Sequence, residues 1–286
     1  MSEYKKNHTI PKFMLEYWSD KGSAFQGVHV YDINTKRYYI STGIGKKPFS
    51  FAITKDLYIH NSYSKRAVGL EKWFSQQENS LSLLIKQAHN KEAIKITSTF
   101  ALTGILMGLT SLEYRSNYDI NKILKAIENN KTLREQISAS PLRPPEQLVL
   151  ENIIHLVTEQ HLEFIPTEMV FGFPPNNNNW VISDRPFFND NNFEYRFVVL
   201  TNKLILGYRR SKAFTYNYID FNEEFHEFFN KLIALNAREW LVAYSEREIK
   251  KYSSIYQTDE WKQKVINDKI IFKPIKYLSS GWTIGK

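Results

Sequence analysis

The chain has 286 residues, with a hydrophobic content of 42% and an aromatic content of 15%, which excludes an intrinsically disordered protein because ample apolar surface can be buried. Cysteine is absent, and this excludes disulfides, thiolate zinc sites and cysteine nucleophiles. The formal net charge of +8 favours anionic partners such as nucleic acid, nucleotides or acidic lipid, although a charge that only maintains solubility explains it equally well.

The amino-terminal residues include lysines but no apolar run of signal-peptide length, so we expect a cytoplasmic protein. The most apolar stretch runs from Thr97 to Leu112 and contains Thr and Ser. It is shorter than the about 20 apolar residues that a membrane-spanning helix needs. The pattern therefore predicts a buried core helix and no membrane insertion.

The first half of the chain predicts a hairpin followed by two packed helices. Two β-rich runs between Gly27 and Ser41 flank a polar turn, as in a β-hairpin. Apolar residues recur every three to four positions from Gly69 to Asn90, which predicts an amphipathic helix. The next predicted helix, about Glu92 to Tyr114, is apolar nearly all round, and Gly104 and Gly108 would let a neighbouring helix approach closely.

The middle of the chain predicts a charged, exposed helix from Asp119 to Ser138, which ends before the prolines at positions 141, 144 and 145. A further helix is predicted from Glu146 to Glu163. The prolines and the asparagine run at 174–179 predict a surface loop.

The last part predicts strands again before a late helix. Residues 180–182 predict a short buried strand that ends at Ser183 and Asp184, and residues 197–208 predict a second hairpin. Helical spacing returns at Phe221, with a strand expected at 241–244. Because no Gly-, Ser- or Pro-rich linker separates these elements, we expect a single α+β domain over residues 1–286, mainly helical, with a small antiparallel sheet or hairpins.

The carboxy-terminal segment, residues 247–286, is basic and rich in aromatic residues. It carries nine Lys or Arg against four Asp or Glu. Its cations would contact phosphates and its rings would stack on bases, as in single-strand binders. We expect Trp261 and Phe272 to be at least partly buried, and the expected nucleic-acid-binding side chains are Lys250, Lys251, Lys262 and Lys264.

Several ordered motifs are shared with a known family. The chain opens with H-T-I-P-K-F-M-L-E-Y-W and continues with G-V-H-V-Y-D, L-E-K-W-F-S-Q-Q-E, S-L-E-Y-R, W-V-I-S-D-R-P and F-N-K-L-I-A-L-N-A. In this order they resemble the bacterial family known as domain of unknown function 4238, whose signatures are an amino-terminal His-x-x-Pro and a downstream Ser-Asp-x-Pro. That family commonly has Asn where this chain has Arg185, and a Leu-Ser-Pro where this chain has Leu200-Thr201-Asn202. The resemblance implies candidate positions and no particular reaction.

Two candidates come from the signature motifs. His8 could be a general base or a metal ligand, or it could cap the first helix. Asp184 follows a predicted strand, and carboxylates at strand ends often project into ligand-binding crevices. The alternative for Asp184 is an Asx turn that leads into Pro186. Ser183 is interpreted as a neighbour of Asp184 and not as a nucleophile.

Further candidates lie on the predicted helices. Glu71 and Glu78 are seven positions apart on one helix face, where carboxylates could bind Mg²⁺ or Mn²⁺ or simply face solvent. We expect the solvated role for Glu71, and Glu78 is the better candidate because it lies beside the apolar face. Arg115 could bind phosphate, complement the end of a helix, or pair with a buried acid. Asn230 and Asn236 could make side-chain hydrogen bonds in a functional site or in a polar core network.

The leading functional hypothesis is a nuclease, phosphodiesterase or other hydrolase that acts on nucleic acid or nucleotides, in bacterial defence or as a toxin. Asp184 and Glu78 would hold Mg²⁺ or Mn²⁺, His8 would activate water or protonate the leaving oxygen, and Arg115 would stabilise phosphoryl charge. The alternative is a non-catalytic sensor or adaptor that binds nucleic acid or a protein partner, with the same polar residues serving the fold.

Overall fold

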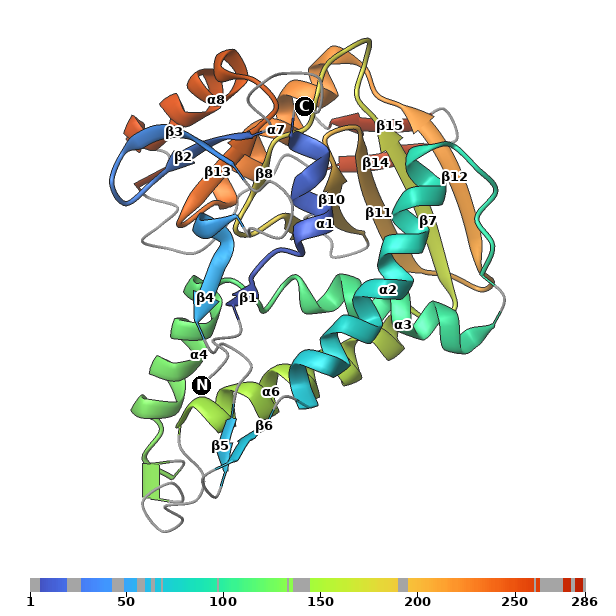
Figure 1. Ribbon diagram of the computed structural model, residues 1–286. Coiled ribbons are helices and arrows are strands. Elements are labelled where there is room, and N and C mark those ends of the chain that lie inside the picture. Colours follow the sequence, from blue (N-terminus) through green and yellow to red (C-terminus); the bar gives the residue numbers. More distant parts are fainter. Residues whose placement is uncertain are drawn as a thin grey trace.

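The computed structural model of the chain contains both helices and strands (Figure 1). It describes residues 6–19, 27–42, 49–55, 60–62, 65–67, 69–96, 98–132, 134–135, 145–189, 195–259, 261–262, 275–278 and 281–284. The α+β class expected from the sequence is confirmed. None of the helices in these ranges has the length and apolar character needed to cross a membrane.

One sheet joins an early segment of the chain to segments from its second half. Its four strands lie in the order β3-β2-β13-β8, and every pair is antiparallel. The predicted hairpin at 27–41 is confirmed as the pair β2–β3, whereas the strand predicted at 180–182 lies at 182–183. Helix α8, Glu246–Ser253, packs against β2 and β13. The strand bounds are β2 Val28–Asp32, β3 Arg37–Ser41, β8 Ile182–Ser183 and β13 Trp240–Ala243.

The second sheet has five strands in the order β12-β7-β11-β10-β9. The hairpin predicted at 197–208 is confirmed as β10–β11, but the sheet is larger than expected and one pair, β12–β7, is parallel. The parallel pair arises because the chain passes the start of β7 after β11 and enters β12 on its other side. The bounds are β7 Thr167–Phe173, β9 Phe187–Asn189, β10 Arg196–Thr201, β11 Leu204–Arg210 and β12 Thr215–Asp220.

Helices α2, Gly69–His89, and α3, Thr99–Ser111, pack closely against each other. A Cβ atom built on Gly108 would lie 3.3 Å from the carbonyl oxygen of Gln77, so the close approach predicted for the glycines is confirmed. The helix predicted from Glu92 begins only at Thr99. The hydroxyl of Ser98 accepts the N–H of Ala101 and caps this start.

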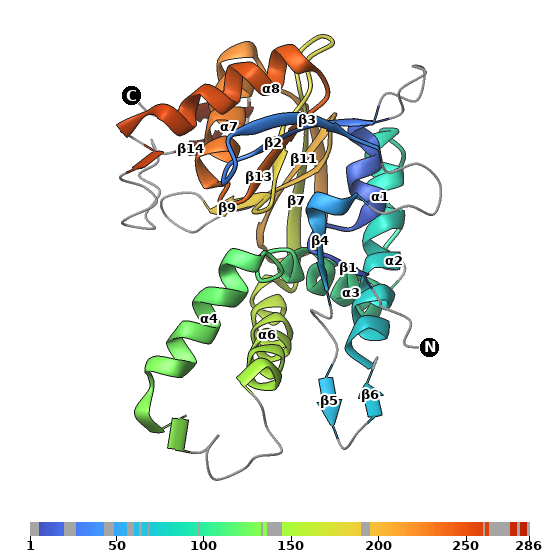
Figure 2. The same ribbon diagram turned by 60° about the vertical axis from the view of Figure 1, so that its left-hand side comes forward.

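Helices α4, Asn117–Asn129, and α6, Pro145–Gln160, lie on the side of the molecule opposite α8 (Figures 1 and 2). They share a small apolar cluster with the facing parts of α2 and α3, which includes Phe74, Met107, Ile120, Ile127, Ile153 and Val157. The other helices are α1, Lys12–Leu15, and α7, Glu223–Asn236, which begins at the Asn222 cap. Short 3-10 turns occur at Glu16–Trp18, Ser50–Ala52, His161–Phe164 and Ser254–Gln257.

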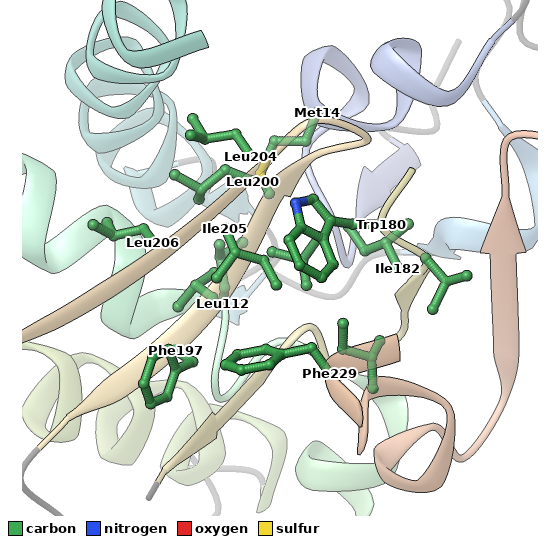
Figure 3. Close-up of a cluster of buried hydrophobic side chains, with 14 of the residues drawn as sticks. Met14, Leu112, Trp180, Ile182, Phe197, Leu200, Leu204, Ile205, Leu206 and Phe229 are labelled. Atoms are coloured by element: carbon green, nitrogen blue, oxygen red, sulfur yellow. The ribbon is translucent and has the colours of Figure 1, made fainter. Parts of the chain in front are cut away.

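The main hydrophobic core fills the space between the two sheets, α1, α2, α3 and α7. Trp180 lies at its centre, among Leu200, Leu204 and Ile205, with Phe229 of α7 across from it (Figure 3). Three further strand pairs are small: Lys6–His8 with Ile53–Lys55, His60–Ser62 with Lys65–Ala67, and Ile275–Leu278 with Gly281–Ile284.

Candidate functional site

Asp184 directly follows β8 and lies beside the loop that connects α7 to β13. Its Oδ1 accepts the backbone N–H groups of Arg238, Glu239 and Trp240, at 3.0, 3.1 and 3.4 Å. Only 1% of the residue is exposed. This carboxylate therefore fixes the conformation of the α7–β13 loop.

Burial controls the acidity of Asp184. Desolvation raises its pKa to about 6, although the three backbone N–H groups and the charge of Arg185 act in the opposite direction. The second oxygen, Oδ2, is also buried and accepts no hydrogen bond from the described residues. The charged form is disfavoured because one of its oxygens has lost water without gaining a donor.

Glu239 is a second carboxyl group with a shifted acidity. Its Oε2 accepts the side-chain amide of Asn117 at 3.0 Å. Desolvation and the charge of Asp184 raise the pKa of Glu239 to about 7, and Asp119 and Asp32 add smaller contributions. A carboxyl group that titrates near neutral pH is suited to general acid–base chemistry.

Arg185 joins β8 to the start of α4. Its Nε and Nη2 each lie 3.0 Å from a carboxylate oxygen of Asp119, so the guanidinium forms a two-pronged ion pair. Ser116 caps α4 by accepting the N–H of Asp119 at 3.0 Å. Asn236 donates to the carbonyl oxygens of Arg185 and Phe187, at 3.0 and 2.7 Å. These bonds attach α4 to the sheet.

Tyr118 lies between two guanidinium groups. The guanidinium carbons of Arg185 and Arg238 lie 5.1 and 5.3 Å from the centre of its ring, which is the range of cation–π contacts. Arg238 also donates to three carbonyl oxygens at the end of α7. A cation at this position is favourable because the carboxyl end of a helix carries partial negative charge.

Arg115 and Glu78 form an ion pair at 2.6 Å, between α2 and the segment that follows α3. The Arg115 residue is only 3% exposed, and its guanidinium carbon lies 5.0 Å from the ring centre of Phe74. The pairing interpretation of Arg115 is therefore the one that the contacts support. The polar residues of this region are Glu78, residues 115–119, Asp184, Arg185, Asn236, Arg238 and Glu239.

Comparison with known proteins places the chain in a family. Residues 6–247 match the family model described as Protein of unknown function (DUF4238). The chain belongs to this family. No curated protein and no solved structure matches the chain. The family assignment agrees with the resemblance seen in the sequence and supplies no reaction.

The two signature motifs of this family lie in different parts of the fold. Ser-Asp-x-Pro forms the end of β8 and the adjoining turn, where the hydroxyl of Ser183 donates to the carbonyl oxygen of Arg185 at 3.0 Å. His8 ends strand β1, Lys6–His8, where its backbone is opposite Ile53, and its side chain lies outside the part that the structure describes. The side chain of Glu71 also lies outside that part.

The expected pair of metal ligands does not share a binding site among the described side chains. Glu78 is paired with Arg115, and Oδ1 of Asp184 is taken by three backbone donors. Across the described ranges, no group of three or more His, Asp or Glu side chains is arranged to hold a metal ion. Mg²⁺ and Mn²⁺ prefer several converging oxygens, and such a set does not occur among the described side chains, so the metal site stays a prediction.

Asn230 belongs to a polar network inside the core. Its Oδ1 accepts the N–H of Val181 at 2.9 Å, and its amide group donates to the carbonyl oxygen of Asn179 and to the hydroxyl of Tyr252. His226 contacts the same carbonyl oxygen through Nε2 at 2.8 Å. The network holds the asparagine-rich loop against α7, as the core-network interpretation of Asn230 expects.

The basic lysines of the carboxy-terminal segment are exposed but paired. Lys250 lies 2.5 Å from Glu246, Lys262 lies 2.9 Å from Asp259, and Lys251 contacts Glu227. Trp261 is partly buried against the ring of Tyr256, as expected. The expectations for Lys264 and Phe272 concern residues outside the described ranges.

Sequence reasoning missed Asp119, Arg238 and Glu239. The start of α4 carries the sequence S-N-Y-D, in which the serine and the aspartate three positions later form a helix cap. That pattern predicts a helix start and gives no sign of the distant Arg185. Nothing in the sequence indicates that residues 238–240 surround Asp184.

Proposed function

We propose that this protein is a non-catalytic sensor or adaptor of the cytoplasm that binds nucleic acid. The observation that carries the proposal is the position of two catalytic candidates, Asp184 and Arg115, which are 1% and 3% exposed and bonded to the protein's own groups. A catalytic side chain has to reach its substrate. These two side chains instead stabilise the fold.

The net charge of +8 supports an anionic partner, because a positive field raises the local concentration of anions and speeds their association. The paired lysines of the carboxy-terminal segment contribute little to such a field, since each lies next to a carboxylate. Other cations of the surface must therefore supply it.

Two substitutions of Asp184 separate the structural role from a catalytic one. Asp184→Asn keeps an oxygen acceptor for the three backbone N–H groups, whereas Asp184→Ala leaves them without one. We expect Asp184→Asn to retain both folding and the binding of a labelled oligonucleotide, measured by fluorescence anisotropy. Asp184→Ala should lose both together. Cleavage of DNA, RNA or nucleotides by the wild type that disappears in a folded Asp184→Asn protein would contradict the proposal.

A hydrolase is the second candidate, and one observation favours it. Glu239 is only partly buried, and its pKa is raised to about 7, which suits an acid–base catalyst. In this case Glu239→Gln should abolish cleavage while the melting temperature is maintained. If the wild type cleaves nothing with or without Mg²⁺ or Mn²⁺, the second candidate fails.

A further inference from the structure

Strand β12 forms an outer edge of the five-stranded sheet (Figure 1). Among the described strands its one partner is β7, so no described strand pairs with its other side. Most of its residues are exposed. The strand and the turn that precedes it therefore present side chains and backbone groups to a partner.

Two cations at the start of this edge are not neutralised by a described acid. Arg210 ends β11, which is separated from β12 by β7, and Lys212 lies in the turn between β11 and β12. Both are exposed, and within the described ranges neither forms an ion pair. The neighbouring Arg209 is bound to Glu168 at 2.8 Å, so that acid is already occupied. No acidic residue occurs from Arg210 to Ile219, and Asp220, which ends β12, is paired with Lys91. The local charge is consequently positive, in contrast to the paired lysines of the carboxy-terminal segment.

Aromatic rings follow these cations along the chain. Phe214, Tyr216 and Tyr218 occupy every second position, and successive ring centres are 6.2 and 5.9 Å apart. The series is anchored at Tyr218, whose hydroxyl donates to the carbonyl oxygen of Glu92 at 2.5 Å. Tyr216 is 37% exposed, so its ring is accessible at the open edge.

We propose that Arg210, Lys212, Phe214 and Tyr216, here named the β12 edge, form a binding surface for single-stranded nucleic acid. The two cations contact backbone phosphates, and the ring of Tyr216 stacks on an unpaired base. Positive groove residues combined with aromatic rings are the elements by which proteins hold single strands without reading their sequence. The inference rests on the proposed function and adds where the nucleic acid binds and which form it takes.

The test measures binding of a fluorescein-labelled single-stranded oligonucleotide of mixed sequence to the full chain by anisotropy, at several salt concentrations. The logarithm of the association constant falls linearly with the logarithm of the salt concentration, and each phosphate contact contributes about 0.7 to the steepness on a single strand. The double variant Arg210→Gln/Lys212→Gln should therefore make this slope shallower by about 1.4. The matched control is Lys250→Gln/Lys251→Gln, which removes the same charge from lysines that are already paired. It should leave the slope unchanged.

Substitution of the ring tests stacking separately from charge. Tyr216→Ala should weaken binding at least about fivefold, whereas Tyr216→Phe, which keeps the ring, should bind like the wild type. A duplex of the same sequence should bind more weakly than the single strand and should not respond to Tyr216→Ala. Thermal melting of each variant shows whether it is folded.

The outcomes distinguish the two proposals. If the wild type binds no nucleic acid, both the proposed function and this inference are wrong. If the wild type binds but the edge variants match it, or the lysine control loses affinity instead, the β12 edge is not the surface and the proposed function stands. Equal competition by polyglutamate would show a surface for acidic protein segments, which also overturns the assignment to nucleic acid.

Discussion

Asp184 places a carboxyl group where an apolar side chain would be easier to bury. Its ionised form loses water and regains three backbone donors on only one oxygen. Glu239 lies close enough for the two charges to oppose each other. The same loop also needs acceptors for its N–H groups, and this requirement explains why a carboxyl group is tolerated at position 184.

The stability of the protein should depend on pH through these two carboxyl groups. In the unfolded chain the carboxyl groups of Asp184 and Glu239 ionise near 3.8 and 4.5, whereas in the folded protein their pKa values are about 6 and about 7. The stability that the protonated forms contribute is therefore complete at low pH and is lost as pH rises through 6 and 7. For Asp184 the loss is roughly 3 kcal/mol, and for the less buried Glu239 it is smaller.

Urea unfolding of the wild type and of Asp184→Asn at pH 4.5 and pH 8 measures this difference. The free energy of unfolding of Asp184→Asn should change less between the two pH values, because that site no longer titrates. Equal changes in both proteins would show that Asp184 ionises in the folded state as it does in the unfolded chain.

A second prediction at this scale concerns Asn230, which satisfies both donors and acceptors in the core. Asn230→Ala leaves the N–H of Val181 and the carbonyl oxygen of Asn179 with fewer partners. We expect a loss of about 2–4 kcal/mol in the free energy of unfolding. The control Asn121→Ala removes an exposed amide of α4 and should cost little. A loss at Asn230 no larger than at Asn121 would refute a role of the network in stability.

At the scale of elements, the close packing of α2 and α3 depends on two glycines that are not equivalent. A Cβ on Gly104 would meet the hydroxyl of Ser80 at 3.1 Å, and this side chain can rotate away. At Gly108 the nearest atoms are the carbonyl oxygen of Gln77 and the Cβ of Leu81, both at 3.3 Å. These two atoms are fixed to the backbone of α2 and can move only with the helix.

The two alanine substitutions should therefore change the free energy of unfolding in opposite directions. Gly104→Ala gains up to about 1 kcal/mol of helix propensity, because the contacting side chain can adjust. Gly108→Ala pushes the helices apart and should lose about 1 kcal/mol overall. Thermal melting of the two proteins side by side provides the measurement. Equal melting temperatures would mean that the helices separate without cost.

At the scale of the whole molecule, one sheet joins an early segment of the chain, residues 28–41, to a late one, residues 240–243. Strand β2 lies between β3 and β13, so residues 240–243 depend on residues 28–32 for one of their two partners. The first part of the chain also buries Ile10, Met14 and Trp18 in the main core. Neither half of this sheet can bury its apolar surface without the other.

A chain that starts at residue 49 should therefore not unfold cooperatively, since it lacks β2, β3 and α1. Coexpression of residues 1–48 as a separate fragment should restore a cooperative melting transition, because the missing contacts are noncovalent. Circular dichroism during heating follows both cases. A truncated chain that melts like the full protein would contradict the central position of β2.

The sequence by itself determined the α+β class, the hairpins at β2–β3 and β10–β11, helix α2 and the family. These features depend on local periodicity, turn residues and ordered motifs, which are visible along a single chain. The sequence also identified candidates for a functional or structural polar role, namely Asp184, Arg115, Glu78 and Asn230. It did not show which residues they contact.

Only the tertiary structure decided what those residues contact. The guanidinium of Arg115 reaches Glu78 across 37 positions, and Arg185 reaches Asp119 across 66. The parallel pair β12–β7, the start of α3 at Thr99 and the pairing of the basic lysines likewise depend on which segments lie side by side. Such contacts form because burial removes water from polar groups, and each group then binds the nearest available partner. The spacing of residues along the sequence does not reveal which partner that is.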